Sequence, residues 1–143
     1  MKEILPDLKN VIFNVFQDML FVFPDEYDNE VKFPDNWIKC RIKLYKEKTI
    51  YFSLYFTPNQ ARIITENYLG QNDDLPDSII YETIKETANV VGGNFLNSFK
   101  KDYSLGIPEL LDTEDKNILE KKYKEGNGIL LDIEDEPFLI LVS

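Results

Sequence analysis

Two neighbouring stretches in which apolar residues take every second position constrain the fold of this chain most strongly. In residues 37–45 apolar side chains alternate with basic ones: Ile38, Cys40, Ile42 and Leu44 against Lys39, Arg41 and Lys43. Residues 50–56 alternate in the same way, and a polar turn at 46–48 separates the two stretches. Successive side chains of a strand point to opposite faces, so this period is typical of half-buried strands. The sequence therefore predicts an antiparallel hairpin.

Other stretches follow the helical period. Between residue 3 and about residue 22, apolar residues recur at spacings of three and four: Leu8, Val11, Ile12, Val15, Phe16, Met19 and Leu20. A second long helix is expected from about residue 78 to residue 99. A shorter helix is expected from Pro58 to Tyr68, with Thr57 as its N-cap and Gly70 at its end.

The remaining segments predict loops and short strands. The acidic stretch 24–30 lacks a period and is expected to be a loop. Short strands are expected at 103–107 and 119–125, followed by a turn at 126–128 and a hairpin of strands 129–133 and 138–142. Together these elements favour a single α+β domain spanning residues 1–143. We expect an antiparallel sheet of about five or six strands with two long helices packed on one face.

The composition excludes several classes of function. The 16 basic and 26 acidic residues give a net charge of −10, which disfavours nucleic acid and anionic membranes as partners. The chain has no histidine, which excludes Ser-His-Asp and Cys-His catalysis, and we predict no metal site. The one cysteine, Cys40, lies in the apolar alternation and is interpreted as a core residue. Without a signal peptide or an apolar run of about 20 residues, the protein is expected in the cytoplasm.

The second long helix carries the most informative residues. Its apolar seam, at steps of four, four, three and four, consists of Ile80, Ile84, Ala88, Val91 and Phe95. A second seam, displaced by two residues and hence to the opposite side, consists of Glu82, Glu86, Asn89 and Gly93. Asparagine and glycine are poor helix formers, and each glycine costs about 1 kcal/mol relative to alanine. Their presence on the outer seam indicates a docking or catalytic face.

Simpler interpretations of the same residues stay open. Every surface helix has a solvated polar face, and Glu86 and Asn89 fit that description in an unrelated binding domain. The pair Gly92-Gly93 can also end a helix, with Asn94 beginning a separate turn. A hydrolase with paired carboxylates is disfavoured, because acidic pairs such as Asp73-Asp74 lie in predicted loops without a companion base or metal-ligand set.

The pattern Glu86-x-x-Asn89-x-x-x-Gly93-Asn94 on a long helix, followed by Gly106-Ile107-Pro108, resembles the single phosphatase motif of CheX-type proteins. These proteins belong to the CheC, CheX and FliY group of chemotaxis phosphatases. The resemblance extends to the order of elements along nearly the whole chain. CheC-type chains carry two such motifs, whereas the first helix here has no Glu-x-x-Asn. The family often has Asp or Ser four residues before the glutamate, where this chain has Glu82.

The resemblance implies a function. The chain is expected to hydrolyse the aspartyl phosphate of a CheY-like response-regulator receiver domain. Asn89 is then the residue that orients the attacking water, and Glu86 pairs with a lysine of the receiver. Glu82 and Gly93 are expected to contact this partner. No cofactor of its own is expected, since Mg²⁺ is supplied in the receiver active site. The resemblance also implies a homodimer, with strands contributed across the interface.

The main alternative is a CheX-like module without catalysis. Such a module binds a receiver or a flagellar switch protein through the same helix, and the departure at Glu82 is the feature that favours it. The two hypotheses differ in one respect: in a phosphatase, substitution of Asn89 abolishes turnover and leaves binding intact, whereas a binding module has no turnover to lose.

Overall fold

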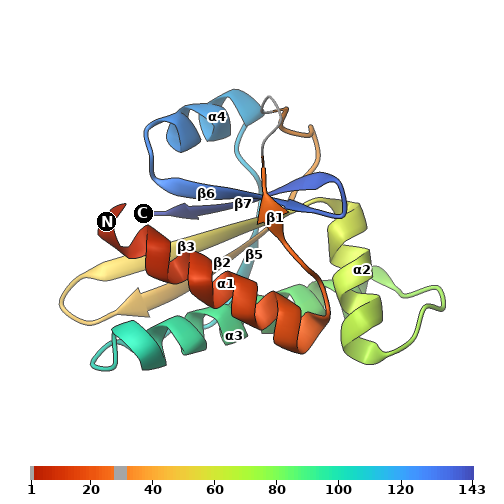
Figure 1. The fold of residues 1–143 in the computed structure, drawn as a ribbon, viewed down its shortest axis with the longest axis horizontal. Helices are drawn as coiled ribbons and strands as arrows, with labels where there is room; N and C mark the ends of the chain where they lie inside the picture. The colour runs from red at the N-terminus through yellow and green to blue at the C-terminus, as the bar shows by residue number, and fades with distance from the viewer. Residues whose placement is uncertain (1, 28–31) are drawn as a thin grey trace.

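The computed structural model describes residues 2–27 and 32–143. These residues form a seven-stranded antiparallel sheet in the order β1-β6-β7-β3-β2-β4, with β5 also paired to β2 (Figure 1). The strands are β1 Asp25–Glu26, β2 Ile38–Tyr45, β3 Thr49–Phe56, β4 Ser104–Leu105, β5 Glu109–Leu111, β6 Gly128–Ile133 and β7 Glu136–Val142. The predicted α+β class and its antiparallel sheet are confirmed, with seven strands in the described residues where five or six were expected.

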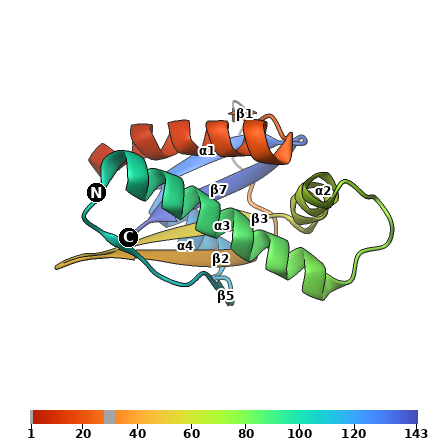
Figure 2. The same ribbon diagram turned by 90° about the horizontal axis from the view of Figure 1, so that it is seen from below.

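The two long helices lie on the same face of the sheet, as predicted (Figure 2). α1 spans Leu5–Leu20, after a short 3-10 turn at Lys2–Ile4, and α3 spans Asp77–Phe99. Phe95 of α3 packs edge-on against Phe52 of β3, with ring centroids 5.1 Å apart. Within the described residues, no helix combines the length and the apolar character that crossing a bilayer requires.

The hairpin of β2 and β3 supplies the centre of the core beneath these helices. The two strands pair in unbroken register, from Ile38 opposite Phe56 to Tyr45 opposite Thr49. Cys40 is fully buried on the helix-covered face, and burial raises the pKa of its thiol to about 12. The thiol therefore stays protonated, as expected for a core residue.

α2, Pro58–Leu69, begins at the predicted residue and ends one residue later than predicted, directly before Gly70. The Thr57 hydroxyl accepts a hydrogen bond from the Gln60 N–H at 3.1 Å, and the Gln60 side chain accepts one from the Thr57 N–H at 3.0 Å. This reciprocal capping satisfies two backbone donors at the helix start. Gly70 ends the helix with φ 68°, a left-handed conformation that favours glycine. The helix packs against α3 (Figure 2).

The predicted strand at 119–125 is wrong, because this segment belongs to a helix, α4, Lys116–Lys124. The Asp115 carboxylate caps it by accepting a hydrogen bond from the Asn117 N–H at 2.8 Å. Leu119 is the buried residue of α4, and it belongs to a second apolar cluster on the other face of the sheet. The final hairpin is apolar on both faces because α1 packs against one face of it and α4 against the other.

Three short strands at the sheet edges also differ from the prediction. β1 forms inside the stretch 24–30, which is predicted as a loop, and it pairs with β6; residues 28–30 lie outside the described residues. β4 is shorter than the predicted strand 103–107, and β5 has no counterpart in the prediction. Each is held by backbone pairing to a longer strand, which a hydrophobic period does not reveal.

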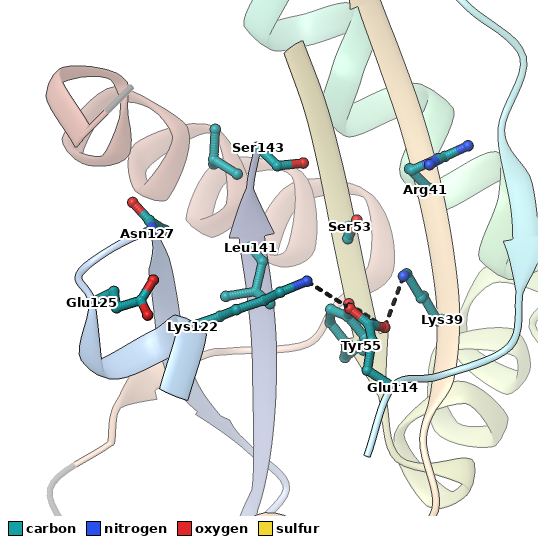
Figure 3. A pocket seen from close by; sticks show the side chains of 11 residues that line it. Lys39, Arg41, Ser53, Tyr55, Glu114, Lys122, Glu125, Asn127, Leu141 and Ser143 are labelled. Atoms are coloured by element: carbon teal, nitrogen blue, oxygen red, sulfur yellow. Dashed lines mark hydrogen bonds and ion pairs between the residues drawn. The ribbon is translucent and has the colours of Figure 1, made fainter. Parts of the chain in front are cut away.

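Glu114 links the segment before α4 to the sheet face that lies away from α1 and α3 (Figure 3). Its carboxylate accepts hydrogen bonds from Lys39 Nζ at 2.8 Å, Tyr55 Oη at 3.0 Å and Lys122 Nζ at 3.2 Å. Burial acts to raise the pKa of this carboxyl group, but hydrogen bonds from Lys39, the backbone, Tyr55 and Lys122 outweigh it. They lower the pKa of Glu114 from 4.5 to about 2. The ionised carboxylate therefore stabilises the folded state.

We expect Glu114→Gln to lower the free energy of unfolding at pH 7 by about 1–2 kcal/mol, a value reduced because water still reaches the carboxylate. Because the folded pKa lies below the unfolded one, this contribution is complete above pH 4.5 and is lost as the pH falls towards 2. Urea unfolding at pH 7 and pH 3 measures the difference. Glu47→Gln, in an exposed turn, is the control. An equal loss at both pH values would contradict this account.

Candidate functional site

α3 runs without interruption through Gly92-Gly93 to Phe99, so the glycine pair does not end the helix. On its inner side, four residues of the apolar seam are fully buried: Ile84, Ala88, Val91 and Phe95. On its outer side, Glu82 and Glu86 are exposed, while Asn89 and Gly93 are half-buried. The structure thus brings the four residues predicted for the site together on the outer face of one helix.

Gly92 and Gly93 of α3 differ in whether internal packing requires a glycine. A Cβ added at Gly92 would meet Leu105 Cδ1 at 2.9 Å and Ile42 Cγ1 at 3.2 Å, so Gly92 permits the close approach of α3 to the sheet. A Cβ added at Gly93 would meet only Leu105 Cδ2, at an ordinary 3.8 Å. Internal packing therefore does not require a glycine at position 93, which leaves a flat surface beside Asn89.

The polar groups on the outer face differ in their contacts. Glu82 forms an ion pair with Lys85 at 3.2 Å, and the Asn94 side chain donates to the Val90 carbonyl at 2.8 Å. The part of the chain that the structure describes offers no hydrogen bond or ion pair to the Glu86 carboxylate or the Asn89 carboxamide. These two groups are therefore free to contact another molecule.

The segment Gly106-Ile107-Pro108 lies along the β2 edge of the sheet, between β4 and β5. The Gly106 N–H donates to the Lys43 carbonyl at 2.7 Å, and a Cβ at Gly106 would meet Lys43 atoms at 3.1 Å. Gly106 therefore allows this segment to run close to β2. The next residue, Ile107, is 83% exposed.

The chemistry available at this face is limited and specific. A carboxamide donates and accepts hydrogen bonds at the same time, so Asn89 can hold a water molecule in a fixed orientation. A carboxylate such as Glu86 pairs with a cation. In the ranges 2–27 and 32–143, no group of three or more Cys, Asp or Glu side chains is arranged to hold a metal ion. The face is suited to completing an active site on a second molecule.

Residues beside Glu86 were not singled out from the sequence. A narrow crevice brings Glu86 together with Met19 and Tyr68, and its other walls are Val15, Leu20, Thr87 and Val90. Met19 is 44% exposed, although its spacing assigns it to the buried stripe of the first helix. The sequence feature that could have indicated exposed apolar residues here is the apolar run at positions 21–23, which continues beyond the helix to Pro24.

A larger cavity of about 290 Å³ opens on the other face of the sheet, around Glu114 (Figure 3). Lys39, Tyr55 and Lys122 line it, and all three form hydrogen bonds with the Glu114 carboxylate. These contacts hold the chain's own segments together, and the cavity lies on the sheet face away from α3. We therefore place the candidate site on the outer face of α3.

The two glycines give a matched test of this geometry. Gly93→Ala is expected to raise the free energy of unfolding by about 0.5–1 kcal/mol, because alanine favours the helix and the added methyl meets no close atom. Gly92→Ala is expected to lower it by about 1 kcal/mol, because the methyl overpacks the contact with Leu105 and Ile42. Urea unfolding measures both. Equal effects at the two positions would contradict the assigned orientation of α3.

This chain matches both a family model and solved structures of known proteins. Residues 38–132 match the model of the family described as chemotaxis phosphatase CheX. The chain is similar in structure to CheX from Desulfovibrio desulfuricans, with a TM-score of 0.74 and 13% identity over 99% of this chain and 98% of that one. For CheX from Vibrio vulnificus the values are 0.71 and 14% over 99% and 97%.

A third similar structure is the complex of CheX with CheY, BeF3 and Mg²⁺ from Borrelia burgdorferi. Its TM-score is 0.67 and its identity 15%, over 96% of this chain and 94% of that one. No curated protein matches the sequence. At such low identities the structural likeness establishes the fold, whereas the family model covers well over half of the 143 residues. On that match, the chain belongs to the chemotaxis phosphatase CheX family.

Proposed function

We propose that this chain hydrolyses the aspartyl phosphate of a CheY-like receiver domain. The observation that carries the proposal is the pair Glu86 and Asn89, which lie one turn apart on the outer face of α3. Neither group has a hydrogen-bond or ion-pair partner within the described residues. Membership of a chemotaxis phosphatase family supports the reaction. The solved complex of a CheX with CheY supports the partner class.

In the proposed reaction, α3 lies against the phosphorylation site of the receiver. The Asn89 carboxamide holds a water molecule in line with the phosphorus, so that the oxygen attacks as the bond between phosphorus and the aspartyl oxygen breaks. The products are inorganic phosphate and the free aspartate. The Mg²⁺ of the receiver supplies the charge stabilisation, so this chain contributes orientation rather than a nucleophile.

The other residues of the outer face position the partner. Glu86 pairs with a receiver lysine and thereby fixes the register of the two proteins. Gly93 lets the receiver surface approach the helix closely, because no side chain projects there. Glu82 lies one turn before Glu86 and contacts the edge of the partner, while its own charge is balanced by Lys85. A homodimer stays a prediction from the family resemblance.

Asn89→Ala is expected to lower the turnover rate by about 100-fold, because the attacking water loses its orienting group. Its affinity for the receiver is expected to change little. Phosphate release from a Mg²⁺-loaded receiver charged with an acyl phosphate measures the rate, and titration with a BeF3-treated receiver measures affinity. Asn117→Ala, on exposed α4, is the control. Binding without acceleration by the wild type would instead identify a non-catalytic module that binds a receiver or a flagellar switch protein.

Glu86→Gln is expected to weaken receiver binding by about tenfold, since a charge-assisted pair becomes a neutral hydrogen bond. The rate at saturating receiver is expected to fall less than in Asn89→Ala. Comparing KM and kcat of the two variants separates the binding role of Glu86 from the catalytic role of Asn89. Raising the salt concentration is expected to reduce the difference in KM between the wild type and Glu86→Gln, because salt screens the ion pair. An unchanged KM in Glu86→Gln would show that Glu86 does not contribute to receiver binding.

A further inference from the structure

Five large apolar side chains at or next to the ends of α1 and α2 are exposed. Phe21 and Phe23, which follow α1, are 66% and 68% exposed. The other members of this patch, Met19, Tyr68 and Leu69, are also exposed. We call these five residues the apolar shoulder. Single exposed apolar residues need no explanation, but several together at one junction mark a surface that contacts another molecule.

Phe21 is also held in a backbone conformation that phenylalanine disfavours. It is the C-cap of α1 and has φ 52°, in the left-handed region where glycine is the usual residue. The Val22 N–H donates to the Phe16 carbonyl at 2.9 Å, which completes the helix end. Folding alone thus favours glycine at position 21. A phenylalanine here lowers stability through its backbone conformation and exposes an aromatic ring. We take this as an indication that the ring contacts another molecule.

The apolar shoulder adjoins the candidate site. Met19 and Tyr68 form one side of the narrow crevice whose other side includes Glu86 and Val90 of α3. The Asn67 side chain, one residue before Tyr68, lies 3.5 Å from the Phe21 carbonyl oxygen and donates to it. The end of α1 therefore contacts α2, which packs against α3 (Figure 2). Through the shared crevice, Met19 and Tyr68 of the shoulder adjoin Glu86.

We propose that the apolar shoulder is a second contact surface for the same phosphorylated receiver, so the inference rests on the proposed function. The partner whose cation reaches Glu86 lies over Met19 and Tyr68, since these side chains share one crevice with that carboxylate. The surface that fits is therefore an apolar patch beside the lysine of the receiver. A second copy of this chain is a poorer occupant, because on this crevice it would cover Glu86, the residue that the proposed function assigns to the receiver.

Phe21→Gly separates a binding role from a folding role. Glycine accepts the left-handed conformation, so the melting temperature is expected to stay unchanged or to rise. Loss of the ring is expected to raise KM for the phosphorylated receiver by about tenfold, with kcat unchanged at saturation. Phe23→Ser, outside the helix, is expected to raise KM in the same direction. Ile118→Ala, 49% exposed on α4 at the other face of the sheet, is the control.

Each outcome has one meaning. A raised KM in both phenylalanine variants, with wild-type values for Ile118→Ala, supports the proposal. An unchanged KM in Phe21→Gly and Phe23→Ser, while the wild type accelerates phosphate release, overturns the shoulder and leaves the phosphatase intact. A shift in sedimentation from dimer to monomer with unchanged KM assigns the shoulder to a second copy and overturns the proposal. No acceleration and no receiver binding by the wild type overturns the proposed function itself.

Discussion

The close contact between α3 and β2 at Gly92 determines where every residue of the candidate site lies. With no side chain at that position, the helix rests directly on Ile42 and Leu105, and Phe95 packs edge-on against Phe52 one turn further along. A helix fixed on its inner side can present its outer side in only one way. Glu86 and Asn89 therefore project from a rigid element rather than from a loop, which is the arrangement that favours a defined geometry towards a partner.

Much of the fold follows from patterns that act locally. The alternation in residues 37–56 predicts the β2–β3 hairpin, and the helical period predicts α1 and α3 together with the seam that faces the sheet. α4 could not be recognised, because it buries only Leu119 and its charges obscure a helical stripe. β1, β4 and β5 depend on pairing with strands distant in the sequence, and no local pattern records such pairing.

The placement of the candidate residues on the outer face of α3 could also be predicted from the helical period. Asn89 and Gly93 stood out because asparagine and glycine are costly on an exposed helix face, and Glu86 because it lies one turn before Asn89 in the family motif. The different roles of Gly92 and Gly93 emerged only from the packing of Leu105 against the helix. The apolar shoulder was hidden for a physical reason, since apolar residues at the end of an amphipathic helix have the same spacing whether they are buried or exposed. Only the structure separates Met19 from its buried neighbour Leu20.

The position of β7 has a consequence for how the protein assembles. This strand lies between β6 and β3, so it joins residues 136–142 to residues 49–56 through the middle of the sheet. Contacts between segments so far apart require a long loop to close before they contribute energy, which slows folding. Until β7 is in place, β3 has a free apolar edge, and the helices have only part of their sheet to pack against. We therefore expect β7 insertion to complete the core late, and a chain that still lacks it to be prone to pairing with other chains through β3.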